Sequence, residues 1–151
     1  MTVHLTDTIA AGKAWLLARL DAGEHCPLCG QMAKMYRRKI NATMARTLIT
    51  FYRTAGMDFF HAPELAGDTH EISQLVWWGL VEEEARARPD GGRAGWWRVT
   101  TKGRAFVLGV LNVPKYAKIY DSKVYNLEGD PITIKDALGS KFSFQELMFG
   151  V

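Results

Sequence analysis

Cys26 and Cys29 are the residues of this 151-residue chain whose types and spacing most directly suggest chemistry. In the segment CPLCG, two thiolates separated by two residues can bind one tetrahedral metal ion from a tight turn. A closed site needs two more ligands, and the sequence has neither a second cysteine pair nor a spaced histidine pair; His25 is adjacent, and the other histidines are scattered (His4, His61, His70). Zinc is therefore the one cofactor to consider, and zinc binding, a redox or disulfide pair, and a plain turn all stay open.

The sequence lacks the motifs of the common catalytic sites. It contains no GxSxG, no Walker-type phosphate loop, no HExxH and no dinucleotide fingerprint. The carboxylates of Glu82, Glu83 and Glu84 form a run on an expected strand and do not have the spacing of a paired catalytic site. We therefore predict that the protein is not an enzyme.

Composition indicates one compact domain, because 48% of the residues are hydrophobic and 23% are charged. No apolar run approaches the roughly 18–20 residues of a membrane-spanning helix. The first residues also lack the basic and then apolar pattern of a secretion signal. We expect a cytoplasmic protein without a membrane partner.

Charge is segregated along the chain although the net charge is only +3. Residues 13–53 contain eight Lys or Arg against two Asp or Glu, whereas residues 58–90 contain eight Asp or Glu against two Arg. On a helix, Lys39, Arg46 and Arg53 are seven residues apart and form one stripe, which Arg37 and Arg38 widen. Such a stripe can follow a phosphate backbone; the alternative is an ordinary solvated helix face.

The elements that must position these residues follow from apolar periodicity, caps and turn residues. Asp68 can cap a short helix, with Glu71 three residues later, and Gly79 can end it. In chain order the pattern predicts a helix over 8–20, the knuckle over 24–30, a long helix over 34–54 and a short helix over 68–79. Strands over 81–88 and 95–100, joined by a turn at 89–92, are expected next, followed by a helix over 101–111 that Pro114 stops. The last part is expected to contain strands over 117–120 and 124–127, turns at 121–122 and 128–130, and helical turns from 133 and 143.

This order is typical of a winged helix-turn-helix, in which a short third helix enters a nucleic-acid groove beside a hairpin. The segment from the third helix to the fourth resembles the wing of MarR- and PadR-type regulators. The residues that carry the resemblance are Leu75, Gly79, Leu80, Val81, Val99, Thr100, Lys102, Gly103 and Arg104. We expect an α+β fold with an N-terminal helix and knuckle (1–33), a winged-helix domain (34–113) and a small C-terminal β/α extension (114–151) packed on it.

Three other segments, CPLCG, YRRKINATMARTLI and DALGSKFSFQELM, resemble uncharacterised phage and prophage proteins. That resemblance implies a phage-encoded protein. It implies no activity.

The third helix is the candidate recognition helix. On a helical wheel Ile72, Leu75 and Val76 point inward, and the opposite face consists of His70, Ser73, Gln74 and Trp77. Ser, Gln and His can hydrogen-bond to base edges or phosphates, and an exposed Trp can stack. The helix has no Lys or Arg and has Glu71 and the Glu82–Glu84 run nearby, so the alternative is that Trp77 and Trp78 are core or interface aromatics.

The expected wing supplies the second basic site. Arg86, Arg88 and Arg93 flank its turn, where a guanidinium can enter a narrow groove or pair with a phosphate. The alternative is a plain solvated turn.

We therefore expect a double-stranded DNA-binding protein, in the manner of a transcriptional regulator. A homodimer formed through the N-terminal helix and the tail from Pro114 is the expected assembly. The alternative is a protein-interaction module in which the tryptophans Trp77, Trp78, Trp96 and Trp97 bind a host protein through an acidic surface.

Overall fold

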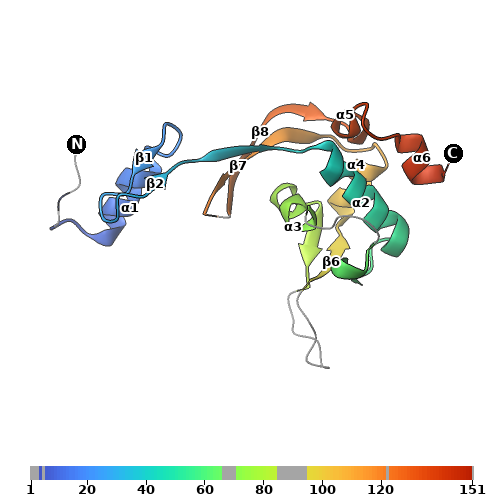
Figure 1. Cartoon of the computed structure of the whole chain (residues 1–151), viewed down its shortest axis with the longest axis horizontal. Helices are drawn as coiled ribbons and strands as arrows, with labels where there is room; N and C mark the ends of the chain where they lie inside the picture. The colour runs from blue at the N-terminus through green and yellow to red at the C-terminus, as the bar shows by residue number, and fades with distance from the viewer. Residues whose placement is uncertain (1–3, 5, 66–70, 85–94, 122, 151) are drawn as a thin grey trace, which may run out of the picture.

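The structure, a computed structural model, describes residues 4, 6–65, 71–84, 95–121 and 123–150. Helices alternate with small antiparallel sheets (Figure 1), which confirms the α+β class. None of the described helices has the length and apolar character that crossing a bilayer requires.

Residues 6–35 form an arm at one end of the molecule (Figure 1), with helix α1 (Ile9–Leu17) and a short hairpin of β1 (Glu24–His25) and β2 (Met32–Ala33). Thr8 begins α1, because its hydroxyl accepts a hydrogen bond from the N–H of Ala11. No residue of α1 is buried. Leu20 behind it is fully buried, and its carbonyl accepts the N–H of Met35 at 2.9 Å, so the chain after α1 is held against the last residues of the arm.

Helix α2 (Ala42–Ala55) is the centre of the body. Its buried residues recur at three- and four-residue spacing, as an amphipathic helix requires (Met44, Ala45, Thr47, Leu48, Ile49, Phe51). Asn41 begins the helix, because its side-chain oxygen accepts the N–H of Met44 at 2.8 Å. Gly56, at φ +61°, ends it.

One antiparallel sheet packs below α2 and has the strand order β4-β6-β5. Its strands are β4 (Phe60–His61), β5 (Val81–Glu83) and β6 (Trp96–Val99). Between β4 and β5 lie the 3-10 turn η1 (Ala62–Glu64), the short helix α3 (Ile72–Leu75) and the 3-10 turn η2 (Val76–Trp78). Helix α4 (Thr101–Val107) follows β6, and Thr100 caps it.

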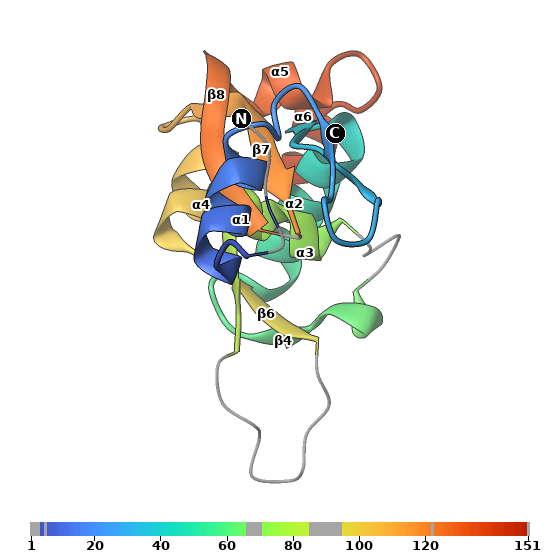
Figure 2. The ribbon, with the colours of Figure 1, turned by 90° about the vertical axis from the view of Figure 1, so that its left-hand side faces the viewer.

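A second sheet with the order β3-β7-β8 covers the other side of the body. Figure 2 shows the two sheets on opposite sides of α2 and α3. The strands of this second sheet are β3 (Tyr36–Lys39), β7 (Val113–Tyr120) and β8 (Lys123–Ile132). The chain ends in α5 (Ile134–Leu138) and α6 (Phe144–Phe149), and one hydrophobic core runs from Ile40 to Met148.

The prediction of one helix over 34–54 is wrong in its first part. Residues 36–39 form β3, which pairs with β7 so that Arg38 faces Ala117 and Lys39 faces Tyr116. The apolar residues Tyr36 and Ile40 fit a helical repeat with Met44, but the helix begins only after the Asn41 cap. A partner strand far along the chain therefore decides the structure of this segment.

Other predicted boundaries also change. The turn predicted at 128–130 lies inside β8, where irregular pairing with β7 near Tyr116 admits Gly129 at φ +93°. Pro114 does not stop the helix, as predicted, but is part of β7 and faces Pro131. Helix α4 ends at Val107, not at 111, and β5 extends only to Glu83 among the described residues.

Candidate nucleic-acid interface and cysteine knuckle

The segment α3–η2 is fixed against the body by three side chains spaced by three residues. Ile72, Leu75 and Trp78 are all buried. The indole Nε1 of Trp78 donates to the carbonyl of Pro114 in β7 at 2.8 Å. These contacts set which side of α3 faces outward.

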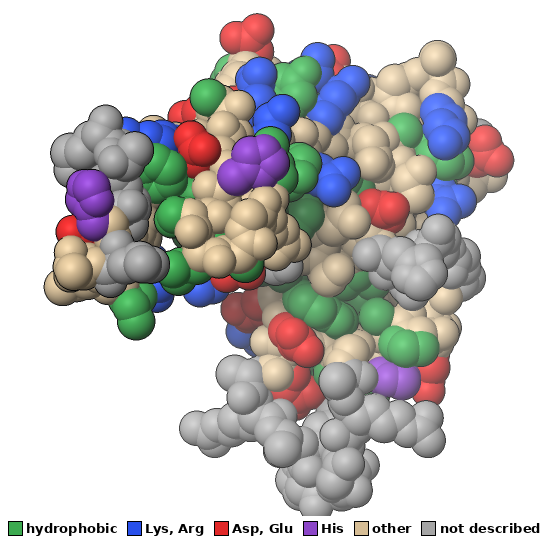
Figure 3. All heavy atoms as spheres, turned by 60° about the vertical axis from the view of Figure 1, so that its left-hand side comes forward, with side chains coloured by type: hydrophobic (Ala, Val, Ile, Leu, Met, Phe, Trp, Pro, Cys, Tyr) green, Lys and Arg blue, Asp and Glu red, His purple; other side chains and the backbone are tan. Residues whose placement is uncertain are grey.

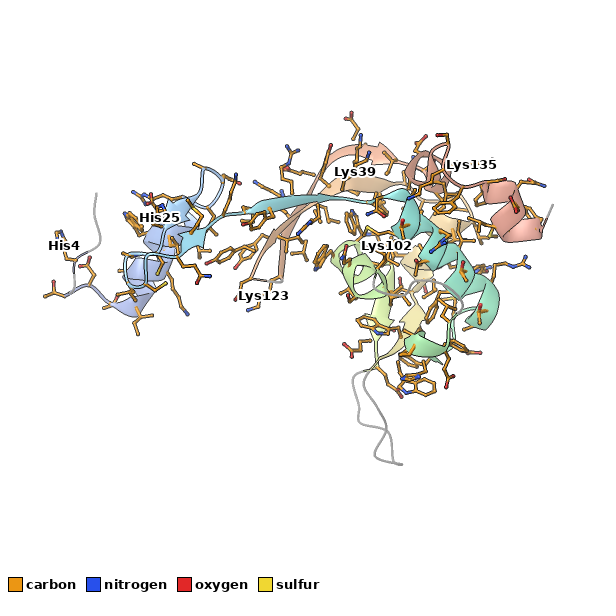
Figure 4. All side chains as sticks on the ribbon, viewed as in Figure 1. His4, His25, Lys39, Lys102, Lys123 and Lys135 are labelled. Carbon is orange, nitrogen blue, oxygen red and sulfur yellow. The ribbon has the colours of Figure 1, made fainter. Side chains whose placement is uncertain are left out.

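The end of η2 is tied to the start of α4. Gly79, at φ +73°, ends the turn, and its carbonyl accepts the hydroxyl of Thr100 at 2.6 Å. The side chain of Lys102 lies over Gly79, so a cation sits beside the end of η2; Figure 4 labels this residue. Sequence reasoning did not select Lys102 as a site residue, although it belongs to the wing pattern.

The outer side of α3–η2 differs in part from the prediction. Ser73 is exposed, and Gln74 and Trp77 are half-buried, whereas His70 lies outside the described residues. Val76 was expected to point inward but is 40% exposed. The chain tightens to a 3-10 turn of about three residues per turn, and the residue three after Leu75, namely Trp78, therefore takes the inward place.

The hairpin of β5 and β6 stands beside α3. Val81 faces Val99 in the register, and pairing continues through the N–H of Glu84, which donates to the carbonyl of Trp96 at 2.9 Å. Glu82 pairs with Arg98 on the neighbouring strand, so the guanidinium offsets one charge of the acidic run. The predicted wing residues Arg86, Arg88 and Arg93 lie outside the described residues.

The basic stripe predicted on one helix does not exist. Arg37, Arg38 and Lys39 lie on β3, while Arg46 and Arg53 lie on α2. The Arg46 guanidinium stacks over the ring of Phe142 at 5.1 Å, and Arg53 donates to the carbonyl of Met148. The two helix arginines thus hold the C-terminal segment against α2, which local sequence cannot reveal.

Basic residues gather instead on the outer face of the second sheet. Arg37 and Lys118 are cross-strand partners, and Lys39 shares their face because residues two apart on a strand point the same way. Figure 4 shows Lys39 on the side of the sheet away from β6, and Figure 3 shows Lys and Arg side chains gathered over this upper part of the molecule. Sequence reasoning missed Lys118, because pairing of β3 with β7 is not locally encoded.

Part of this charge is already paired. Arg37 contacts Glu128 at 2.5 Å and lies over the ring of Tyr116 at 4.7 Å. Lys118 contacts Asp21 at 2.6 Å, and the hydrogen bond to that carboxylate raises the pKa of Lys118. Lys39 is exposed on this face and has no ion pair among the described residues.

The cysteines form the predicted knuckle between β1 and β2. The N–H of Cys26 donates to the carbonyl of Gln31 at 2.7 Å, and the N–H of Gly30 donates to the carbonyl of Cys26 at 2.9 Å. Both thiols are free. Hydrogen bonds from the backbone N–H groups of Cys29 and Leu28 to the Cys26 sulfur lower the pKa of Cys26.

A cavity of about 480 Å³ opens beside the knuckle. Both cysteines line it, together with Lys34 just before β3, Tyr36 and Arg38 on β3, and Trp77 from η2. Trp77 is therefore turned toward the arm and the sheet. The groove-facing role expected of Trp77 stays a prediction.

Comparison with known proteins gives no relative: no family model, no curated protein and no solved structure matches this chain.

Proposed function

We propose that this protein binds double-stranded DNA through α3 and the β5–β6 connection, in the manner of a winged helix. The observation that carries the proposal is the order α2, β4, α3–η2, β5, β6 combined with the sheet order β4-β6-β5. This arrangement sets a short helix beside an antiparallel hairpin, which is how winged-helix proteins place a helix in the major groove and a wing beside it.

The chemistry of the outward side fits a groove. Ser73 is exposed and Gln74 is half-buried, and their hydroxyl and amide groups can hydrogen-bond to base edges. Lys102 adds a cation at the end of η2 that can pair with a phosphate. By sequence, the connection between β5 and β6 contains Arg86, Arg88 and Arg93, which we propose hold the backbone or the minor groove.

The acidic residues near α3 do not all oppose DNA binding to the same extent. Arg98 offsets the charge of Glu82. Glu83 is exposed on β5 and Glu71 is half-buried at the start of α3, so both contribute repulsion of a phosphate. The proposed contact is therefore sensitive to salt and depends on the wing arginines.

The tryptophans that suggested a protein-binding surface are not displayed together. Trp78 is buried, and Trp77, Trp96 and Trp97 are half-buried. Trp97 packs against the core, and Trp96 stacks on His61 with ring centroids 5.2 Å apart. No observation favours the protein-interaction module over DNA binding.

A variant pair tests the proposal. The triple change Arg86→Ala, Arg88→Ala and Arg93→Ala is expected to weaken binding to a fluorescent duplex at least about tenfold, because each lost phosphate contact removes a counterion-release contribution. The matched control removes three cations that do not belong to α3 or the wing, by Lys123→Ala, Lys135→Ala and Lys141→Ala; Figure 4 labels the first two. We expect the control to bind within about twofold of the unmodified protein. Equal losses in both triple variants would show that binding follows total charge and not this surface.

A further inference from the structure

The knuckle presents half of a tetrahedral metal site. Its turn is closed by the two backbone hydrogen bonds that join Cys26 to Gln31 and Gly30, and Gly30 has φ +73°. The N–H groups of Leu28 and Cys29 point at the Cys26 sulfur. Hydrogen bonds of this kind help to orient a sulfur ligand.

The described part of the chain does not complete the site. No group of three His, Cys, Asp or Glu side chains in it could hold a metal ion. His25 is the nearest histidine in sequence, and the contact of its Nδ1 with the carbonyl of Gly30 at 2.9 Å leaves Nε2 free, but its ring does not form such a group with the two cysteines. Two sulfurs alone supply half of the four donors that zinc takes.

The surface of the arm around the knuckle contains exposed apolar side chains. Leu28, between the two cysteines, is 82% exposed, and Met32 on β2 is 53% exposed. Ile9 on α1 is 77% exposed, and no residue of α1 is buried. Leu28 and Met32 lie beside the thiols, and Met32 lines the same cavity; exposed apolar side chains that occur together favour an interface, whereas a single one is ordinary.

We propose that Cys26 and Cys29 of two copies of this chain share one Zn²⁺ and thereby join the two arms. A twofold axis through the ion doubles the donor set from two sulfurs to four, which is a closed tetrahedral site. Each thiol gives its proton to the solvent as its zinc–sulfur bond forms, so four protons leave per ion and nothing is oxidised or reduced.

The charge and the shape of the molecule suit this assembly. A zinc ion with four thiolates has a net charge of −2, and Lys34 and Arg38 line the same cavity as the two sulfurs. The arm lies at the end of the molecule away from α2 and α6 (Figure 1). The proposal does not depend on DNA binding.

The test uses the full chain, freed of metal with a chelator under reducing conditions and titrated with Zn²⁺. Zinc is counted by atomic spectroscopy, and the mass in solution is measured by light scattering after size exclusion. We expect uptake to stop at one zinc per two chains, and the mass to double at the same zinc concentration. With Co²⁺ instead, we expect the absorption bands of a tetrahedral tetrathiolate site.

Variants identify the ligands. Cys26→Ser and Cys29→Ser should each lose zinc uptake and the zinc-dependent doubling of mass. Their circular dichroism should match that of the unmodified protein, because the arm has no part in the main hydrophobic core. His25→Gln is the matched control and should keep both properties, since no histidine is a ligand.

Four results would overturn the proposal. They are no zinc uptake, one zinc per chain, loss of zinc in His25→Gln, and a doubled mass that persists in the cysteine variants without zinc. One zinc per chain would mean that the chain completes its own site. A doubled mass without zinc would mean that another surface forms the dimer.

Discussion

Gly103 lies where the packing of the fold leaves no room for a side chain. A Cβ built there would lie 2.0 Å from the carbonyl oxygen of Leu80 and 2.8 Å from Cγ1 of Val99. Neither neighbour is the far end of a flexible side chain, so α4 would have to move away from β5 and β6. The glycine of the wing pattern is therefore explained by close packing and not by an unusual backbone angle.

We predict that Gly103→Ala lowers the free energy of unfolding by about 1–3 kcal/mol, the usual cost of overpacking. Chemical denaturation followed by circular dichroism measures this. Gly12→Ala in α1 is the control, because a Cβ there meets nothing within 4 Å; it should stabilise by up to about 1 kcal/mol through helix propensity. Equal effects of the two changes would contradict the close packing of α4.

The backbone of the knuckle alters the chemistry of Cys26. The N–H groups that point at its sulfur stabilise the thiolate and lower the pKa of Cys26. The thiolate therefore forms at a lower pH in the folded protein than in the unfolded chain.

We predict that alkylation of Cys26 in the metal-free protein reaches half of its maximal rate at a lower pH when the chain is folded than in denaturant. Iodoacetamide labelling followed by peptide mass spectrometry measures the rate at this residue. Identical profiles in both states would show that the knuckle hydrogen bonds do not form.

At the level of secondary-structure elements, the boundary between strand β3 and helix α2 lies at the start of α2. Asn41 caps α2 through the N–H of Met44, and the preceding residues pair with β7. We predict that Asn41→Ala destabilises the protein by about 1 kcal/mol, as loss of an N-cap does, and that Asn41→Ser keeps most of the stability. Thermal or denaturant unfolding compares the two. Equal stability of both variants would place the helix start elsewhere.

The sequence predicts a helix correctly where the buried residues follow the helical period. It fails where pairing with a strand far along the chain determines the local structure. The apolar spacing from Met44 to Phe51 correctly predicts the centre of α2. Tyr36 and Ile40 continue the same spacing, but β7 draws residues 36–39 into a sheet. Strand β4 has only Phe60 and His61, which is too short to give a periodic signal.

The third helix shows a different limit. Ile72 and Leu75 are buried as predicted, but the turn tightens after Leu75 and brings Trp78 inward in place of Val76. A wheel drawn at 3.6 residues per turn cannot show this change of period. Of the outward set, Ser73 is exposed, so the polar part of the candidate surface was predictable, whereas the place of Trp77 beside the arm was not.

For the whole molecule, the segregation of charge along the chain is partly a segregation in space. Basic residues of β3 and β7 lie on the outer face of the upper sheet, and the acidic residues of β5 lie on the other side of the body (Figures 2 and 3). The sequence could predict the sign of each segment. It could not predict that Arg46 and Arg53 would bind the C-terminal segment, because their partners lie far along the chain.

The proposed DNA contact therefore relies on a small number of cations near an acidic strand. Such a contact gains its affinity from the release of counterions and should weaken steeply with salt. A protein that used its apolar surface would show little change over the same range.

The most direct measurement is the fluorescence anisotropy of a labelled random-sequence duplex, titrated with the full chain at several salt concentrations between about 50 and 200 mM. We predict saturable binding whose logarithmic affinity falls with the logarithm of salt at a slope of about −3 or steeper, as three or more phosphate contacts require. No binding at the lowest salt concentration, or an affinity that salt does not change, would contradict the proposal that this protein binds DNA.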